Sequence, residues 1–205
     1  LPISVKLKGT PLERLKFLAV HDTDPFARWE ASQQVATTLL LDMVAARQQG
    51  KALSLDAELV APIAATLAGA AADPAFAAEV MTLPSESFLA DQMATVDVEA
   101  IHAARQFARA EIGRSLAREL AAAYEHFADP GPYRPDGAGI GRRALRNVCL
   151  AYLAAGNDAA EVARAEAQFG AGRNMTDVLA ALAVLADLET PARVRALAAF
   201  YERWR

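Results

Sequence analysis

The residues best suited to chemistry in this 205-residue chain are three histidines, one cysteine and a short cluster of arginines. The histidines are His21, His102 and His126. None of them forms the i, i+4 pair with which zinc peptidases place two imidazoles on one helix face, and no H-E-x-x-H sequence occurs. We therefore predict no catalytic residue and no metal ligand in this chain, and interpret the histidines as exposed or hydrogen-bonded residues of helices.

The single cysteine, Cys149, lies in an apolar run with no histidine near it in sequence. This setting is typical of a small buried hydrophobic residue and not of a nucleophile. One cysteine excludes an internal disulfide and fits a reducing compartment, so we expect a cytoplasmic location. The chain has no phosphate-binding loop, no G-x-G-x-x-G and no G-x-S-x-G.

The arginine cluster consists of Arg142, Arg143 and Arg146. On a helix, Arg142 and Arg146 share a face and Arg143 lies about 100° around the axis. Cations are disfavoured at a helix start because the helix dipole is positive there. We therefore expect an ion pair with an acidic neighbour in preference to a solvated helix start, with a phosphate or carboxylate ligand as the alternative.

The overall composition excludes several classes of partner. The net charge is −4 and the pI is near 5.4, so neither nucleic acid nor an anionic membrane surface is expected to bind. Residues 1–10 carry no signal-peptide pattern, and the longest apolar stretch, 178–186, is far shorter than the roughly 20 residues that span a bilayer. An apolar fraction of 54% fits a folded domain.

The elements that must position these residues are almost all helical. Alternation of Ile3, Val5 and Leu7 with polar residues predicts a strand over residues 1–8, and everything after it has helical spacing and helix caps. The helices are expected at 10–20, 24–50, 56–71, 73–82, a short one from 84, one long helix at 97–127, and then 141–155, 158–169, 176–188 and 191–205. Residues 129–141, with three prolines and four glycines, are expected to be the one clear loop.

Three side-chain expectations accompany this assignment. The long helix should bury one face that runs from Val98 to Phe127, and the 24–50 helix should bury Phe26 and Trp29. Asn174 should adopt a left-handed or turn conformation, with Thr176 as the cap of the next helix. Together these features predict an all-α fold, an α-superhelical, HEAT-like array of roughly ten helices preceded by one short β-strand.

An ordered series of segments resembles bacterial alanyl aminopeptidases (aminopeptidase N), zinc peptidases of the gluzincin class. The segments are 24–31, 46–50, 53–55, 82–85, 142–153, 168–169, 174–182 and Trp204. The resemblance implies that residues 1–9 end a β-sandwich domain and that residues 10–205 begin the C-terminal helical domain, which caps the active site. The chain has no initial Met and ends inside an amphipathic pattern, so we expect a piece of a longer protein.

The resemblance carries no catalytic residue over to this chain, because the zinc ligands and the catalytic glutamate of the family match nothing here. It implies zinc in the parent enzyme and no cofactor in this chain. The implied partners are the catalytic domain of the same polypeptide and the peptide substrates of the parent, and exposed apolar surface would favour self-association of the isolated chain. Arg143, Asn147 and Asn174 are candidates for lining the substrate channel. The alternative is an independent helical-repeat scaffold that binds a peptide or protein.

Overall fold

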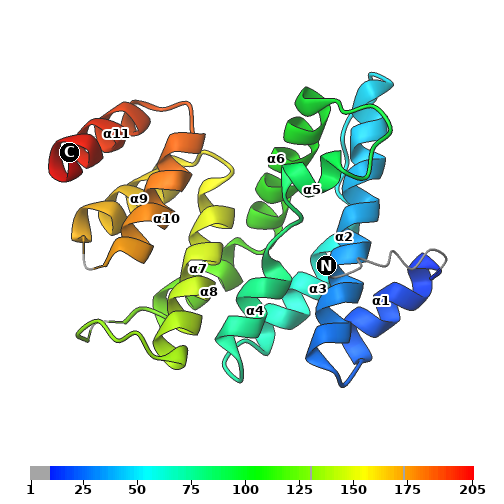
Figure 1. Cartoon of the computed structure of the whole chain (residues 1–205), viewed down its shortest axis with the longest axis horizontal. Coiled ribbons are helices and arrows are strands. Elements are labelled where there is room, and N and C mark those ends of the chain that lie inside the picture. Colours follow the sequence, from blue (N-terminus) through cyan, green and yellow to red (C-terminus); the bar gives the residue numbers. More distant parts are fainter. Residues whose placement is uncertain (1–9, 130, 173) are drawn as a thin grey trace, which may run out of the picture.

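The computed structural model describes residues 10–129, 131–172 and 174–205, so the strand predicted over residues 1–8 lies outside the described part (Figure 1). The described part is all-α, and the superhelical helix array predicted from the sequence is confirmed. Its helices are α1 (Leu12–His21), α2 (Pro25–Gln48), α3 (Ala57–Ala68), α4 (Pro74–Met81), α5 (Glu86–Ala90), α6 (Val98–Ser115), α7 (Ala117–His126), α8 (Gly137–Ala154), α9 (Ala159–Ala171), α10 (Met175–Asp187) and α11 (Pro191–Trp204).

Most of these helices begin where a side-chain cap stands in the sequence. An aspartate side chain accepts a hydrogen bond from a backbone N–H of the first helical turn at the starts of α2, α3, α4, α6, α8 and α9. Such a bond satisfies one of the backbone donors that a helix start leaves unpaired. In α2 and α4 a proline follows the cap, where its missing N–H costs nothing.

Helix α8 is the centre of the array. It contacts α4, α6, α7, α9 and α10, and Figure 1 shows α1–α6 on one side of it and α9–α11 on the other. The sequential pairs α1 with α2 and α9 with α10 pack against each other, as expected of stacked helical repeats. No helix among the described residues is long and apolar enough to cross a membrane.

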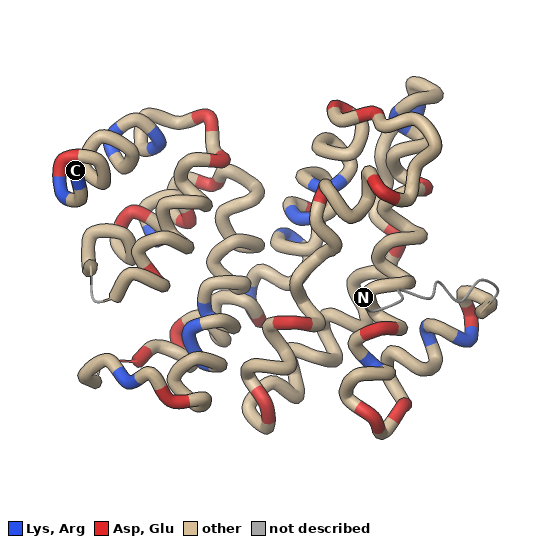
Figure 2. The backbone as a smooth tube through the Cα atoms, viewed as in Figure 1, with Lys and Arg blue, Asp and Glu red and all other residues tan. Residues whose placement is uncertain are grey.

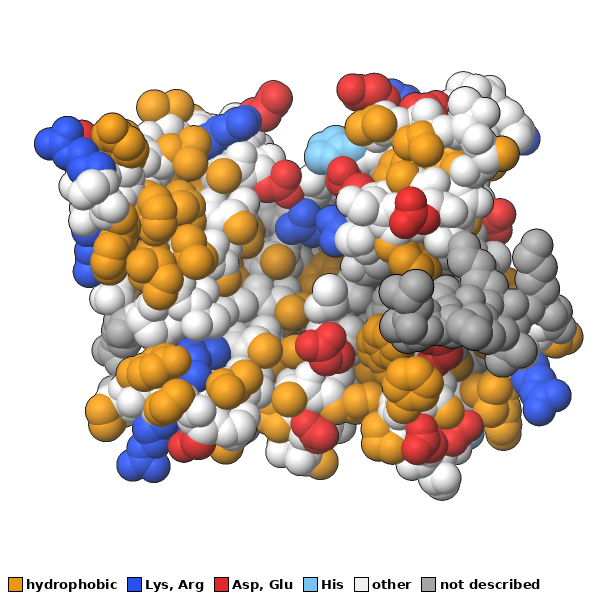
Figure 3. Space-filling view, viewed as in Figure 1, with side chains coloured by type: hydrophobic (Ala, Val, Ile, Leu, Met, Phe, Trp, Pro, Cys, Tyr) orange, Lys and Arg blue, Asp and Glu red, His pale blue; other side chains and the backbone are white. Residues whose placement is uncertain are grey.

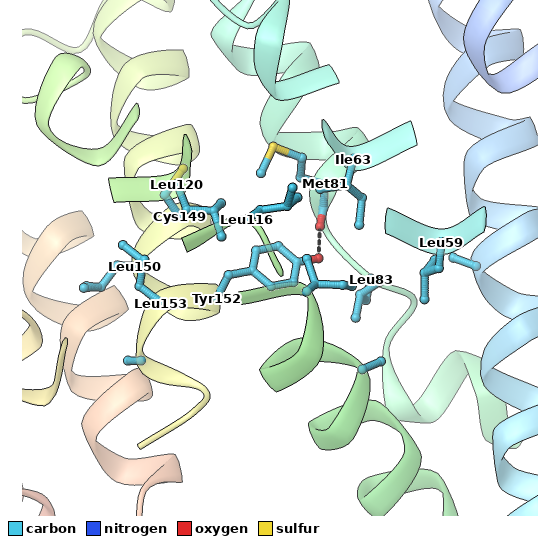
Figure 4. Close-up of a cluster of buried hydrophobic side chains, with 14 of the residues drawn as sticks. Leu59, Ile63, Met81, Leu83, Leu116, Leu120, Cys149, Leu150, Tyr152 and Leu153 are labelled. Atoms are coloured by element: carbon cyan, nitrogen blue, oxygen red, sulfur yellow. Dashed lines mark hydrogen bonds between the residues drawn. The ribbon is translucent and has the colours of Figure 1, made fainter. Parts of the chain in front are cut away.

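The core joins α8 to α4 and α6 through Tyr152 (Figure 4). Tyr152 is buried, and its hydroxyl donates to the carbonyl oxygen of Met81 at 2.5 Å. A Cβ added to Gly113 on α6 would lie 2.1 Å from the Tyr152 carbonyl oxygen. The two helix backbones therefore approach each other as closely as only glycine allows.

The long helix predicted over 97–127 is wrong in one respect, because the chain forms two helices with a break at Leu116. Leu116 has φ −116° and ψ 21°, outside the helical region. The apolar side chains continue through the break, and Ile112, Leu116 and Leu120 are all buried. Since α6 packs on α2 while both α6 and α7 pack on α8, the change of direction keeps both segments in contact with the core.

Two predicted core residues are exposed instead. Phe26 is 69% exposed and Val98 is 66% exposed, each within the first two residues of its helix. Trp29 is half-buried and stacks on Phe26, with 5.7 Å between ring centroids. Both residues lie in the first turn of their helices, where no element of the described part of the chain buries them.

Two predicted boundaries also change. Asp136 caps α8, which begins at Gly137 and not at residue 141, so the loop is shorter than expected. Gly141 packs against α4, where an added Cβ would lie 2.9 Å from the backbone nitrogen of Ala75. Asn174 is itself the cap of α10 and is extended, with φ −155° and ψ 156°, so both the turn at Asn174 and the cap at Thr176 are wrong.

Candidate functional site

A pocket of about 660 Å³ lies among α7, α8, α9 and the start of α10, beside the loop that follows α7. Aromatic and small apolar residues form one part of its wall, and charged or amide side chains form the other. The polar and aromatic part of the lining includes Tyr124, Tyr133, Arg143, Arg146, Gln168, Asn174 and Asp177.

Arg143 is a buried cation, with 4% of its surface exposed. Its guanidinium stacks on the ring of Tyr133, 4.7 Å from the ring centroid, and its Nη2 donates to the carbonyl oxygen of Arg134 at 3.1 Å. The buried Nε has no hydrogen-bond partner. Across the described ranges Arg143 forms no ion pair, so its charge is balanced by a carbonyl and an aromatic face alone.

Arg146 lies one turn further along α8 and faces the ring of Tyr124. Its guanidinium is 4.1 Å from that ring centroid, and its Nε donates to the Tyr124 carbonyl oxygen at 3.3 Å. Arg164 approaches the same ring at 5.1 Å but also pairs with Glu161 and Glu125. Arg146, by contrast, has no carboxylate partner in the part of the chain that the structure describes.

The ion pair predicted for the arginine cluster is confirmed for Arg142, whose Nη2 lies 3.3 Å from Oδ2 of Asp129. The three arginines of the cluster therefore differ in whether a carboxylate pairs with them. They lie in the first half of α8, where Figure 2 shows basic residues, and Asp129 lies in the segment between α7 and α8. One cation is paired, and the other two face the pocket.

A network of amides joins several residues at the wall of the pocket. The buried Gln168 donates through Nε2 to Oδ1 of Asn147 at 2.7 Å and to the backbone carbonyl of Asp177 at 3.1 Å. Asn147 and Asn174 each donate an amide N–H to the Asp177 carboxylate, at 3.1 and 2.7 Å. The network joins α8, α9 and α10 and holds one carboxylate with neutral donors.

Tyr124 completes the network from α7, because its hydroxyl donates to Oε1 of Gln168 at 3.0 Å. Burial raises the pKa of the Tyr124 hydroxyl, although Arg146 and Arg164 oppose this rise by favouring the phenolate. The hydroxyl therefore stays protonated at neutral pH and serves as a donor.

The structure brings the three predicted channel candidates together. Arg143 and Asn174 line the pocket, and Asn147 lies one hydrogen bond behind it through Asp177. Gln168 lies in a segment that resembles the aminopeptidases, and Tyr124 lies within the predicted buried face of residues 97–127, but neither was predicted as a site residue, because their partners are distant in sequence. The helical spacing of Arg143, Arg146 and Asn147 was the one local signal that this face of α8 is polar.

A second polar group connects α6 to α10 beside a groove of about 210 Å³, which residues of α6 and α8, among them Arg105 and Arg109, help to line. Asp187, the last residue of α10, accepts from Arg109 and Gln106 at 2.9 and 2.8 Å. Figure 3 shows a notch here with basic side chains on its wall, and Figure 2 shows the basic residues of α6 on the side toward α10. Burial opposes ionisation of Asp187, but the two hydrogen bonds and the charge of Arg109 together hold its pKa below the ordinary value.

The histidines and the cysteine lie apart from both sites. His102 pairs with Glu86 at 2.9 Å, His21 stacks on Phe17, and His126 meets Phe127 edge-on. Over residues 10–129, 131–172 and 174–205, no three His, Cys, Asp or Glu side chains are grouped so as to hold a metal ion. Cys149 is buried as predicted, and burial raises the pKa of its thiol to about 12.

Comparison with known proteins gives one family and a consistent set of relatives. Residues 12–205 match the family described as a domain of unknown function (DUF3458_C) with ARM repeats. The chain is 36% identical to the aminopeptidase N of Caulobacter vibrioides over 206 residues and 34% identical to that of Escherichia coli over 203 residues. These matches cover 100% and 99% of this chain and 23% of each relative.

The fold has a counterpart among solved structures. Legionella pneumophila aminopeptidase A in complex with aspartic acid superposes with a TM-score of 0.79 at 24% sequence identity, over 97% of this chain and 24% of that one. At this identity the likeness establishes the fold alone. The chain spans about a quarter of the length of the relatives it matches.

Proposed function

Since the chain belongs to the DUF3458_C family of ARM-repeat domains and is homologous over its length to part of bacterial aminopeptidases N, we propose that it is the helical domain of a zinc-dependent aminopeptidase. In this proposal the domain caps the active site and is not catalytic alone. The observation that supports it most strongly is the 34–36% identity to two aminopeptidases N across essentially the whole chain.

The proposal divides the chain at its start. Residues 1–9 are the end of a preceding β-sandwich domain, and residues 10–205 belong to the helical cap. The family match, which begins at residue 12, is consistent with this division. The partner of the cap is then the catalytic domain of the same polypeptide, in the cytoplasm.

The cap acts by shape. A stacked helical array beside an active site limits which peptides reach it and excludes folded proteins, and a site poor in water strengthens the electrostatic interactions within it. The substrates are peptides, from which the parent enzyme removes N-terminal amino acids. Arg143, Asn147 and Asn174 are proposed to lie along the channel, because Arg143 and Asn174 line the pocket among α7, α8, α9 and α10 and Asn147 supports it through Asp177.

In this proposal the zinc of the parent is held by residues outside this chain. The described residues present no group of His, Cys, Asp or Glu that fits a metal ion, so the proposal places zinc in another part of the longer polypeptide. When bound there, zinc would activate water for hydrolysis of the peptide bond. The residues of this chain would bound the space around that site.

The apolar face of α11 bears on the behaviour of the isolated chain. Val194, Leu197, Tyr201 and Trp204 recur at helical spacing and are 45–69% exposed. A stripe of this kind favours association in water, so the proposal includes self-association of the isolated chain. Light scattering over a range of concentrations measures it.

The capping role is tested by complementation. The longer aminopeptidase is produced without residues 10–205 and assayed on an alanine anilide and on a long unfolded polypeptide, with and without the added 205-residue chain. Capping predicts that the added chain lowers cleavage of the long substrate relative to the anilide. An unchanged ratio, together with saturable binding of peptides by a folded monomer of the chain, would favour the independent scaffold instead.

A further inference from the structure

We propose that the pocket among α7, α8, α9 and α10 binds a small organic carboxylate that carries an apolar group. This inference rests on the proposed function, because the ligand would come from the peptidase reaction. It would be either a released amino acid or the carboxyl end of a peptide. It names a ligand class for the pocket, which the resemblance to aminopeptidases does not.

The charges of the pocket favour an anion. Arg143 and Arg146 both line it, and neither forms an ion pair with any described carboxylate. A buried cation is costly unless an anion or several hydrogen bonds compensate it, and Arg143 is 4% exposed with its Nε unpartnered. The neighbouring Arg142 forms an ion pair with Asp129. The other two arginines of the cluster, Arg143 and Arg146, both line the pocket.

The guanidinium groups are also preorganised. Arg143 is held against the ring of Tyr133 and Arg146 against the ring of Tyr124, at 4.7 and 4.1 Å from the ring centroids. Stacking on an aromatic face fixes the plane of a guanidinium. The single hydrogen bond that each guanidinium makes to the described backbone, from Nη2 of Arg143 and from Nε of Arg146, leaves an edge of further N–H groups to donate. A carboxylate is the anion whose two oxygens match such an edge.

The remaining walls indicate what the carboxylate is attached to. Phe127, Pro132 and several alanines line the same pocket, so an apolar group is accommodated next to the charge. A volume of about 660 Å³ is within the usual range of pockets for small ligands. The pocket therefore fits an amino-acid-sized body better than an inorganic ion.

Two carboxylates in the lining argue against a multiply charged ligand. Asp129 and Asp177 are both part of the wall, and Asp177 is held in place by the amides of Asn147 and Asn174. The negative charges of these two aspartates would repel a phosphate dianion in the pocket more strongly than a ligand with a single carboxylate. The same oxygens could accept a hydrogen bond from an N–H or ammonium group of the ligand.

The test is a titration of the folded 205-residue chain, followed by NMR or calorimetry. The ligands are N-acetyl-L-phenylalanine, its C-terminal amide, free L-phenylalanine and inorganic phosphate. We expect at least one of the two acids to bind with a Kd of about 1 mM or below, and the amide and phosphate to bind at least about tenfold more weakly. Preference for the acylated acid indicates a peptide end, and preference for free phenylalanine indicates a released amino acid.

Matched variants assign the binding to the pocket. Arg146→Gln should lower the affinity for the acid by about tenfold. Arg146→Lys keeps the charge but not the planar edge, so it should lower the affinity by less. Arg114→Gln removes the same charge from an exposed position on α6 and should change the affinity less than about twofold. Circular dichroism of each variant verifies that it is folded.

The inference is overturned if the folded chain binds neither acid at about 10 mM, if acid and amide bind equally, or if Arg114→Gln weakens binding as much as Arg146→Gln. None of these results alters the zinc content or the peptidase activity by which the proposed function is judged. A failure of the carboxylate-binding inference is therefore distinguishable from a failure of the proposed function.

Discussion

The amide nitrogen of Gln168 donates to Oδ1 of Asn147 at 2.7 Å and so ties α9 to α8 at the wall of the pocket. Gln168 is 5% exposed, and its carbonyl oxygen accepts from Tyr124 in addition. A buried amide that satisfies donors and acceptors on three other helices fixes their relative positions.

Gln168→Leu removes this link and leaves the Tyr124 hydroxyl and the Asn147 carbonyl without partners. Each buried polar group that loses its hydrogen bond costs about 1–3 kcal/mol, so we expect the free energy of unfolding to fall by about 2–4 kcal/mol. Urea denaturation measures the change. Gln34→Leu, whose amide bonds only to Glu30 on the same helix, is the control and should cost below about 1 kcal/mol. Equal losses for the two variants would refute the role given to Gln168.

Gly113→Ala tests the close approach of α6 and α8. The new Cβ would lie 2.1 Å from the backbone oxygen of Tyr152, so the two helices must separate. Overpacking of this kind typically costs about 1–3 kcal/mol, and because the opposing atom belongs to the backbone we expect the upper end. Gly156→Ala, with no atom within 4 Å of the added Cβ, should leave thermal unfolding nearly unchanged. A Gly113→Ala variant as stable as Gly156→Ala would contradict the packing described.

The bridge between α6 and α10 should make stability depend on pH. The pKa of Asp187 is lower in the folded chain than in the unfolded one, so its contribution is present above the unfolded value near 3.8 and is lost as the pH falls through the folded value. The side chain is 35% exposed, which limits the effect to about 1 kcal/mol. Asp187→Asn should therefore flatten the dependence of unfolding on pH between about 5 and 3. Asp42→Asn, exposed on α2, should not, and an identical profile for both variants would count against the bridge.

Cys149 should be unreactive in the folded chain. Its side chain is buried, and burial raises the thiol pKa to about 12, so very little thiolate exists at neutral pH. A thiol reagent should label it only after urea unfolds the chain, with mass spectrometry as the readout. Complete labelling of the native chain within minutes would show that the core around α8 is open.

The helix starts were predictable because their signals are local. Asp24, Asp56, Asp73 and Asp97 each precede a helix and cap it within three residues, so the sequence alone locates the start. The break at Leu116 was not predictable, because the apolar spacing continues through it and neither Gly nor Pro stands at the break. Only the packing of two segments on different neighbours explains the change of direction.

The site was predictable only in part for a related reason. Arg143 and Asn147 lie one helical turn apart, so the polar face of α8 was visible in the sequence. Gln168 and Tyr124 are 44 residues apart, and their contact arises from the order in which α7, α8 and α9 stack. The cap at Asn174 was missed because Thr176, two residues on, is also a capping residue by type, although Asn is the stronger of the two.

The central claim is that this helical array belongs to an aminopeptidase whose catalytic centre lies in another part of the polypeptide. The most direct test is the zinc content and alanine anilide hydrolysis of the purified 205-residue chain, measured beside the longer polypeptide under the same conditions. We expect zinc and turnover for the longer polypeptide and neither for the chain alone. One equivalent of zinc retained by the 205-residue chain, with turnover in the absence of any other protein, would contradict it.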